Sequence, residues 1–236
     1  MKKYELTGEV KVKFGVTFKR IRALIDFGNV KKGELGGFIE KEENLSHENN
    51  AWVYDDAEVS GNARVYDDAE VSGNAKVYGD AEVYGNAKVY DDAWVSGNAW
   101  VSGNAEVSGN AWVSGNAEVS GNARVYGDAW VSGNAKVYDD AWVSGNAEVS
   151  GNAEVSGNAE VSGNADYVLI GRVGSRFGFT TFFRNKNNEI YVSCGCFLGT
   201  LAKFRKKVKE THGTDTKYAK VYQAAADLAE MQILNK

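Results

Sequence analysis

The sequence predicts a mainly β protein: a triangular parallel β-helix with 18-residue coils, followed by a small C-terminal α+β domain. Three observations support this prediction. An alanine recurs every six residues from Ala51 to Ala165, twenty times without interruption. The 236 residues contain 27 Gly and no Pro, which indicates a repeated turn that needs a flexible backbone. Within the repeats, charged residues also stand 18 positions from residues of opposite charge.

The repeated unit is Ala-x-Val-[Ser/Tyr]-[Gly/Asp]-[Asn/Asp], as in residues 105–110. Alanine and valine are two positions apart, so in an extended segment they point to the same side, while x points to the other. We therefore expect Ala and Val in the core and x on the surface. Gly, Asn and Asp tolerate the left-handed backbone that a corner requires, so each hexad is one short strand and one turn.

Charge at the x positions decides how many strands form a coil, because equivalent positions of stacked coils lie about 4.8 Å apart. A coil of two strands would stack residues 12 apart and align seven like-charged pairs. A coil of three strands stacks residues 18 apart and aligns seven opposite pairs with no like pair. The predicted stacks are Glu70-Lys88-Glu106-Arg124, Glu58-Lys76, Arg64-Glu82 and Glu118-Lys136-Glu154. Ile39 and Leu45 continue the alanine phase backward, so the helix can begin one coil earlier.

These patterns divide the chain into an N-terminal β cap (1–38), the β-helix (39–165) and an α+β domain (166–236). In the last part we expect strands over 167–173, 178–184 and 189–194. Two helices follow, one starting near Thr200 and one after Thr214 or Asp215. Residues 51–165 carry 5 Lys/Arg against 18 Asp/Glu, whereas 166–236 carry 12 against 6. An anionic partner would therefore meet the C-terminal part.

All six tryptophans occupy x positions, and Trp94, Trp112 and Trp130 follow one another at the 18-residue spacing. They are candidates for an oligomer interface, because three adjacent indoles form a patch that monomers seldom leave in water. The alternative is stacking that only stiffens the sheet.

The candidate ligand site lies in the first hairpin of the C-terminal domain, where arginines and hydroxyls alternate with aromatic residues. Such a set can hold a phosphate and stack a base. Its residues are Arg172, Ser175, Arg176, Thr180, Thr181 and Arg184. The alternative is a hairpin that packs its phenylalanines inward. We expect no binding of duplex nucleic acid, because the acidic β-helix would repel it.

The hexads resemble the left-handed parallel β-helix of the hexapeptide-repeat acyltransferases, and the left hand is implied by this resemblance alone. Those enzymes use a histidine as general base, but the only histidines here, His47 and His212, lie outside the repeats. The three-histidine zinc site of the γ-class carbonic anhydrases, which share that fold, is missing too. We therefore expect no catalytic residue, cofactor or metal site, and we expect Cys194 and Cys196 to be buried structural cysteines.

The flanks carry a second resemblance. Residues 33–38, 43–46 and 51–53 look like the start of phage and prophage hexapeptide-repeat proteins related to a bacterial putative transferase family. Residues 170–171, 194–197, 199–201 and 211–213 are similar to a small domain of phage proteins. The resemblance implies a phage or prophage origin and supplies no site.

Together these observations predict a non-catalytic oligomeric scaffold or binding protein, a homotrimer in the host cytoplasm without a membrane segment. It would sequester a small anionic ligand such as a host immune signalling nucleotide. The alternatives are an acyl- or nucleotidyltransferase, with His212 or a carboxylate as base, and a purely structural protein whose β-helices stack end to end.

Overall fold

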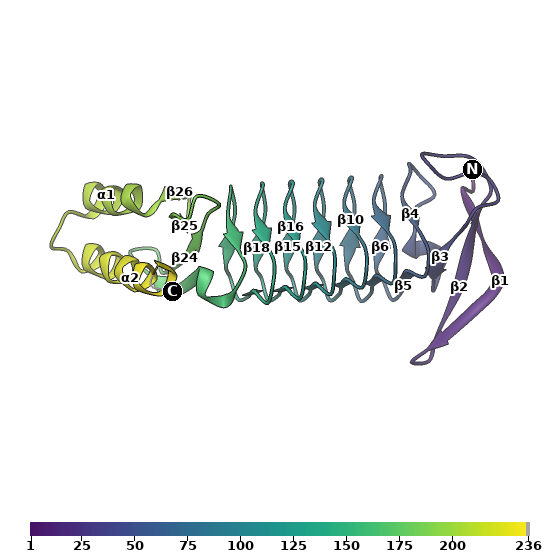
Figure 1. Ribbon diagram of the computed structural model, residues 1–236, viewed down its shortest axis with the longest axis horizontal. Helices are drawn as coiled ribbons and strands as arrows, with labels where there is room; N and C mark the ends of the chain where they lie inside the picture. The colour runs from purple at the N-terminus through teal and green to yellow at the C-terminus, as the bar shows by residue number, and fades with distance from the viewer. Residues whose placement is uncertain (235–236) are drawn as a thin grey trace.

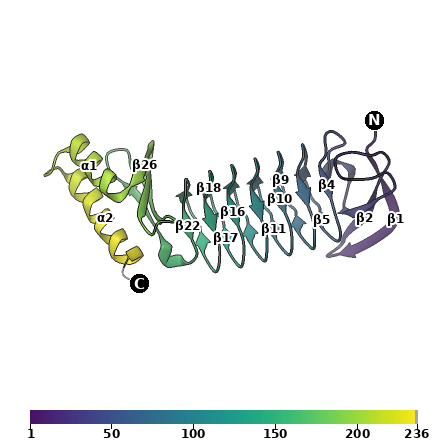
Figure 2. The same ribbon diagram turned by 45° about the horizontal axis from the view of Figure 1, so that its top comes forward.

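The computed structural model describes residues 1–234 and forms an elongated rod. A β-hairpin at the N-terminal end, a regular solenoid and a C-terminal sheet covered by two helices follow one another along its long axis (Figures 1 and 2). The chain thus runs from one end of the rod to the other, and its terminal regions lie far apart.

The solenoid core consists of the repeated alanines from Ala51 to Ala159 and the repeated valines, which are completely or almost completely buried. The intervening x residues form nineteen two-residue strands with these valines. They are β4 (Trp52–Val53), β5 (Glu58–Val59), β6 (Arg64–Val65), β7 (Glu70–Val71), β8 (Lys76–Val77), β9 (Glu82–Val83), β10 (Lys88–Val89), β11 (Trp94–Val95), β12 (Trp100–Val101), β13 (Glu106–Val107), β14 (Trp112–Val113), β15 (Glu118–Val119), β16 (Arg124–Val125), β17 (Trp130–Val131), β18 (Lys136–Val137), β19 (Trp142–Val143), β20 (Glu148–Val149), β21 (Glu154–Val155) and β22 (Glu160–Val161).

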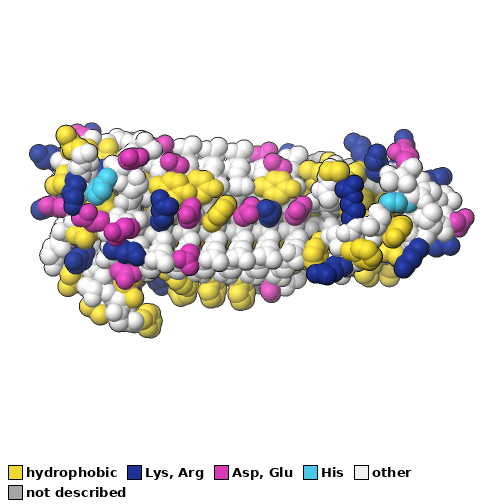
Figure 3. Space-filling model, turned by 180° about the vertical axis from the view of Figure 1, so that it is seen from behind, with side chains coloured by type: hydrophobic (Ala, Val, Ile, Leu, Met, Phe, Trp, Pro, Cys, Tyr) yellow, Lys and Arg dark blue, Asp and Glu magenta, His cyan; other side chains and the backbone are white. Residues whose placement is uncertain are grey.

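Three parallel sheets form the faces of the solenoid, and every strand pairs with the strand 18 residues away. The orders are β5-β8-β11-β14-β17-β20, β4-β7-β10-β13-β16-β19-β22 and β6-β9-β12-β15-β18-β21. The predicted 18-residue coil is therefore confirmed. The register of the predicted charge stacks is confirmed as well, and ion pairs form within them, as in Lys88–Glu70 at 3.1 Å and Lys136–Glu118 at 3.0 Å. Figure 3 shows side chains of both charges alternating with hydrophobic ones along one face.

The corners are held by hydrogen bonds between coils as well as by turn geometry. Where aspartate replaces glycine it adopts a positive φ, as at Asp139 with 59°. Its carboxylate accepts a hydrogen bond from the backbone N–H of the glycine one coil later, at 3.1 Å for Asp139 and Gly157. The next corner residue stacks through its side-chain amide, as in Asn116 to Asn134 at 2.9 Å. The aspartate corners therefore have a structural role.

The N-terminal cap is an antiparallel hairpin, β1 (Tyr4–Lys13) and β2 (Val16–Ala23), continued by β3 (Leu35–Ile39). β3 pairs in parallel with β5, and Leu45 bridges Val65 after a short 3-10 helix, η1 (Glu42–Asn44). The earlier first coil is thus confirmed. The cap also buries Trp52, an x residue, against the edges of the Tyr4 and Phe27 rings.

The C-terminal region begins with η2 (Asn164–Asp166) and a four-stranded antiparallel sheet of β23 (Tyr167–Val173), β24 (Gly178–Arg184), β25 (Ile190–Cys194) and β26 (Phe197–Thr200). The prediction of three strands missed β26. Gly195, with φ of 59°, and Cys196 form a tight turn, so the chain doubles back into a fourth strand. Cys196 is exposed in this turn, which corrects the expectation that both thiols are buried.

Two helices cover the side of this sheet that faces away from the solenoid, α1 (Leu201–His212) and α2 (Lys217–Leu234) (Figure 1). Thr200 caps α1 through its hydroxyl, as its position predicted. In α2 the buried residues are Ala219, Ala225, Ala226, Ala229 and Ile233. Leu228 and Tyr218, which share the helical spacing, are exposed. Neither helix has the length and apolar composition needed to cross a membrane within residues 1–234.

We expect Gly121→Ala to lower the stability of the solenoid. Gly121 has φ of 69°, and a Cβ there would lie 2.8 Å from the backbone nitrogen of Asp139 in the next coil. A left-handed alanine costs about 1–2 kcal/mol, so thermal denaturation should show a midpoint lower by several degrees. Gly8→Ala is the matched control, because no atom lies within 4 Å of its added Cβ. Equal midpoints for both variants would contradict this account of the corner.

Candidate functional site

The strongest candidate site is a row of three indoles on the face formed by β5 to β20. Trp94, Trp112 and Trp130 are direct partners in the parallel ladder, as predicted. The ring centroids of Trp94 and Trp112 are 5.5 Å apart in an edge-on arrangement, and those of Trp112 and Trp130 are 5.2 Å apart and nearly parallel. We call these three residues the tryptophan column. It is the longest uninterrupted aromatic run on any face of the solenoid.

Serines from the preceding coil orient two of these rings. The indole N–H of Trp112 donates to the hydroxyl of Ser96 at 3.2 Å, and that of Trp130 donates to Ser114 at 3.3 Å. Each serine occupies the fourth position of a hexad, so the repeat itself supplies the partner. The rings therefore lie along the face with their polar edges satisfied and their apolar surfaces partly open to solvent.

One basic and one acidic residue extend the tryptophan column at its two ends, Lys76 before Trp94 and Glu148 after Trp130. The Lys76 ammonium lies over the Trp94 ring, 4.3 Å from its centroid. Glu58, the predicted stacking partner of Lys76, is in register with it but gives its carboxylate to Lys11 at 3.0 Å and Lys13 at 2.6 Å. The cap hairpin thus takes this carboxylate away from the solenoid ladder.

Burial would raise the pKa of Glu58, but hydrogen bonds from Lys13 and Lys11 outweigh that effect and hold the pKa below its usual value. Glu58 therefore stays charged and ties the hairpin to the face of the solenoid.

A groove of about 730 Å³ opens between the hairpin and the beginning of the tryptophan column. Phe14, Val16 and Phe18 form the hairpin wall, and Tyr78 and Trp94 form the solenoid wall. Figure 1 shows the tip of the β1–β2 hairpin extending beyond the outline of the coils. Nothing in the hexad pattern predicts this groove, because one of its walls lies outside the repeats.

The structure divides the six predicted ligand residues into two groups. Arg172, Ser175 and Arg176 are exposed at one end of the β23–β24 hairpin, beside Phe177, which is 70% exposed. Neither arginine has an ion-pair partner among residues 1–234. Arg172 lies near the end of β23, and Ser175 and Arg176 lie in the turn before β24.

The other three ligand candidates make contacts inside the fold. Thr181 is buried and accepts a hydrogen bond from the backbone N–H of Glu154 in the last coil, at 2.9 Å. Thr180 is buried on the opposite face of the sheet and donates to the sulfur of Cys194 at 3.2 Å.

Arg184 lies at the far end of β24 from Arg176 and donates to Asp166 at 2.8 Å, as well as to the Ile233 carbonyl. These contacts dock the C-terminal sheet on the solenoid and on α2. Thr180, Thr181 and Arg184 are therefore held by structural contacts, away from the exposed group.

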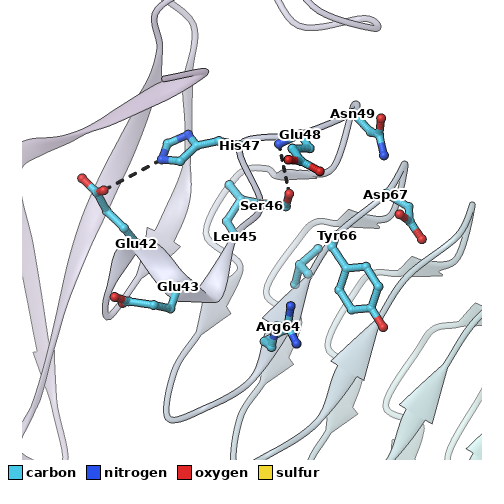
Figure 4. Close-up of a pocket in the computed structure, with 11 residues that line it drawn as sticks. Glu42, Glu43, Leu45, Ser46, His47, Glu48, Asn49, Arg64, Tyr66 and Asp67 are labelled. Carbon is cyan, nitrogen blue, oxygen red and sulfur yellow. Dashed lines mark hydrogen bonds and ion pairs between the residues drawn. The ribbon is translucent and has the colours of Figure 1, made fainter. Parts of the chain in front are cut away.

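Both histidines lie against tyrosines outside the repeats. His47 lines a polar pocket of about 420 Å³ next to the first coil (Figure 4). Its Nδ1 accepts the backbone N–H of Lys3 at 3.2 Å, and its ring stacks on Tyr4 with centroids 4.3 Å apart. Figure 4 shows the ring turned toward Glu42, whose carboxylate is 3.9 Å from Nε2. At the other end of the rod, His212 stacks on Tyr222.

Burial lowers the pKa of His47, although Glu42 acts in the opposite direction. The neutral ring suits its contact, since Nδ1 must keep a free lone pair to accept the Lys3 N–H. His47 thus anchors the N-terminal strand. Within residues 1–234 no group of three His, Cys, Asp or Glu side chains is arranged to hold a metal ion.

We expect His47→Gln to lower the thermal midpoint at pH 7.5, and the difference from the unmodified protein to shrink as the pH falls. The pKa of His47 lies below 6.5 in the folded chain, so the unfolded chain binds more protons as the pH drops through 6.5. The stability that the neutral ring contributes is therefore lost on the acid side. His212→Gln is the control, and its thermal midpoint should change with pH as that of the unmodified protein does. A difference that stays constant from pH 7.5 to 5 would contradict the anchoring role.

A family model described as the YdcK β-solenoid repeat matches residues 117–133, which include β15, β16 and β17. A search of curated proteins gives no match. The matched segment and the coils around it make this chain a β-solenoid protein with a small sheet-and-helix region at its C-terminal end.

Proposed function

We propose that the chain is a non-catalytic scaffold that associates with copies of itself through the tryptophan column and carries its C-terminal region at a fixed distance from its N-terminal cap. The observation that supports this proposal is the column itself. Aromatic residues are enriched at the buried centre of protein interfaces, and a continuous row of indoles is costly to leave in contact with water. Trp130 is 41% exposed, and Trp94 and Trp112 are half-buried.

The other two faces lack such a surface. Their charged x residues pair along the ladder, as in Arg124–Glu106 at 3.6 Å and Arg64–Glu82 at 3.8 Å. Their tryptophans occur singly among these charges, with Trp100 between Glu82 and Glu118 and Trp142 between Arg124 and Glu160. Self-association through the tryptophan column leaves these charged faces in solvent.

We expect Trp130→Ser to weaken self-association about tenfold or more, because an indole at an interface centre contributes on the order of 1–2 kcal/mol. Sedimentation or light scattering over a concentration series measures this effect. Trp142→Ser is the matched control, since Trp130 and Trp142 are both 41% exposed but lie on different faces. Equal weakening by both variants, or a wild-type protein that stays monomeric, would refute the proposal.

A second candidate function is the capture of a small anion at the β23–β24 hairpin, favoured by the exposed group of Arg172, Ser175 and Arg176 beside Phe177. Two guanidinium groups can bind a phosphate, and an exposed phenyl ring can stack a base. The phage-type flanks suggest a signalling nucleotide of the host as the ligand. The scaffold would then hold several such hairpins in one assembly.

For this second candidate we expect the Arg172→Ala/Arg176→Ala double variant to lose binding of AMP at least about tenfold, since each charge-assisted contact contributes about 1.5–3 kcal/mol. Isothermal titration calorimetry measures the affinity. Lys206→Ala/Lys207→Ala removes the same charge from α1 and should bind as the unmodified protein does. No binding to the unmodified protein, or equal losses in both variants, would exclude AMP capture at this hairpin.

A further inference from the structure

The residues along the tryptophan face follow a symmetric order with opposite charges at its ends. Reading along the ladder, Lys76 is followed by Trp94, Trp112, Trp130 and then Glu148. Trp112 is the centre, with one indole on each side and one charge beyond each indole. A rotation by half a turn about Trp112 therefore exchanges the positions of a lysine and a glutamate.

Neither of these two charges has an ion-pair partner among residues 1–234, in contrast to the stacked Lys88, Arg124 and Lys136. Lys76 loses Glu58 to the cap lysines, and its ammonium rests on Trp94 instead. Glu148 is exposed and follows a tryptophan in the ladder, so no cation precedes it there. Each end of the tryptophan column thus presents one uncompensated charge of opposite sign.

The direction in which two copies meet decides whether these charges attract or repel. In a parallel arrangement, which includes a trimer around an axis along the solenoids, equivalent residues meet at one level: lysine beside lysine and glutamate beside glutamate. In an antiparallel arrangement around Trp112, each lysine lies opposite a glutamate. Like charges directly opposite each other on β faces destabilise, and opposite charges stabilise.

We propose that the tryptophan column is a two-fold, antiparallel interface with a second copy of this chain, with Lys76 against Glu148 of that copy at both ends. This inference rests on the proposed function, because it specifies the geometry of the same self-association. It replaces the predicted homotrimer, in which like charges would meet. A two-fold contact of this kind is self-complementary and closes at two subunits.

The groove beside the hairpin fits this arrangement. The rotation about Trp112 brings Trp130 of the second copy opposite Trp94, which lines the groove together with Phe14 and Phe18. Each hairpin then stands beside the last coils of the other copy, and its apolar wall covers the more exposed end of that copy's column. The cap thus becomes part of the interface, which explains why apolar residues line the hairpin above the solenoid face.

Cross-linking between single cysteines distinguishes the two directions. In a Cys194→Ser/Cys196→Ser background, the variants Lys76→Cys and Glu148→Cys are prepared separately and mixed. A short bis-maleimide is suitable, because packed β faces lie about 10 Å apart. We expect a cross-linked dimer in the mixture and little or none in either variant alone. The mixed dimer keeps one intact lysine–glutamate pair, which favours its formation.

Lys88→Cys and Glu160→Cys provide the matched control, since they have the same 72-residue separation on another face. Their mixture should give no cross-link. The mass of the uncross-linked protein is measured in parallel.

The outcomes separate the failure of the geometry from the failure of the proposed function. Cross-linking of Lys76→Cys with itself, or a trimer mass, would overturn the antiparallel geometry and leave self-association through the column standing. A dimer that is cross-linked on the control face, or not cross-linked at all, would overturn both, as would a monomer.

A charge-reversal series gives a second measurement that does not depend on cross-linking. Lys76→Glu and Glu148→Lys should each weaken dimerisation several-fold, and the double variant should regain it. A parallel interface would show no such recovery, because residues of the same charge would still face each other after both charges are reversed.

Discussion

The structure depends on the hydrogen-bond ladder between coils, which places every residue directly beside the residue 18 positions later. The backbone N–H of Trp94 donates to the carbonyl of Ala111, and that of Ser96 donates to the carbonyl of Val113, both at 2.9 Å. The same pattern recurs along the solenoid. The spacing of strands in a sheet leaves no freedom in this alignment. Inside the solenoid, each alanine and valine packs against the alanine or valine of the next coil. Outside, each x residue lies beside the x residue of the next coil. Charge ladders, the asparagine stacks at the corners and the tryptophan column are all consequences of this single alignment.

The repeats were predictable because each of their contacts joins residues at one fixed separation in the sequence. The Glu70-Lys88-Glu106-Arg124 stack required only the period and the rule that opposite charges prefer to meet. The same reasoning found the tryptophan column, since a surface made by one ladder can be located by counting. It failed at Trp52 and Glu58, which occupy ordinary x positions but are buried because the hairpin folds over them. Their partners come from residues 4–27, and no period links that segment to the coils.

The C-terminal region shows the same limit. The hydrophobic spacing predicted its helices, and Phe204 and Val208 are buried as expected. The candidate ligand group was predicted from residue types within one hairpin, but alternate residues of a strand face opposite sides. Thr180 and Thr181 therefore contact different layers, and Arg184 meets Asp166 from the end of the solenoid. Which side each residue takes depends on how the sheet docks, and this docking is a long-range contact without a sequence signature.

The ladder also makes the length of this protein adjustable only in steps. Removing any 18 consecutive residues from the solenoid would shorten the rod by about 4.8 Å and leave every remaining residue beside a residue of its own face. Removing six would instead turn everything downstream by a third of a revolution, and the C-terminal helices would point in a new direction relative to the hairpin. The number of hexads therefore sets the rotation between the two ends of the molecule, and the number of whole coils sets the distance between them.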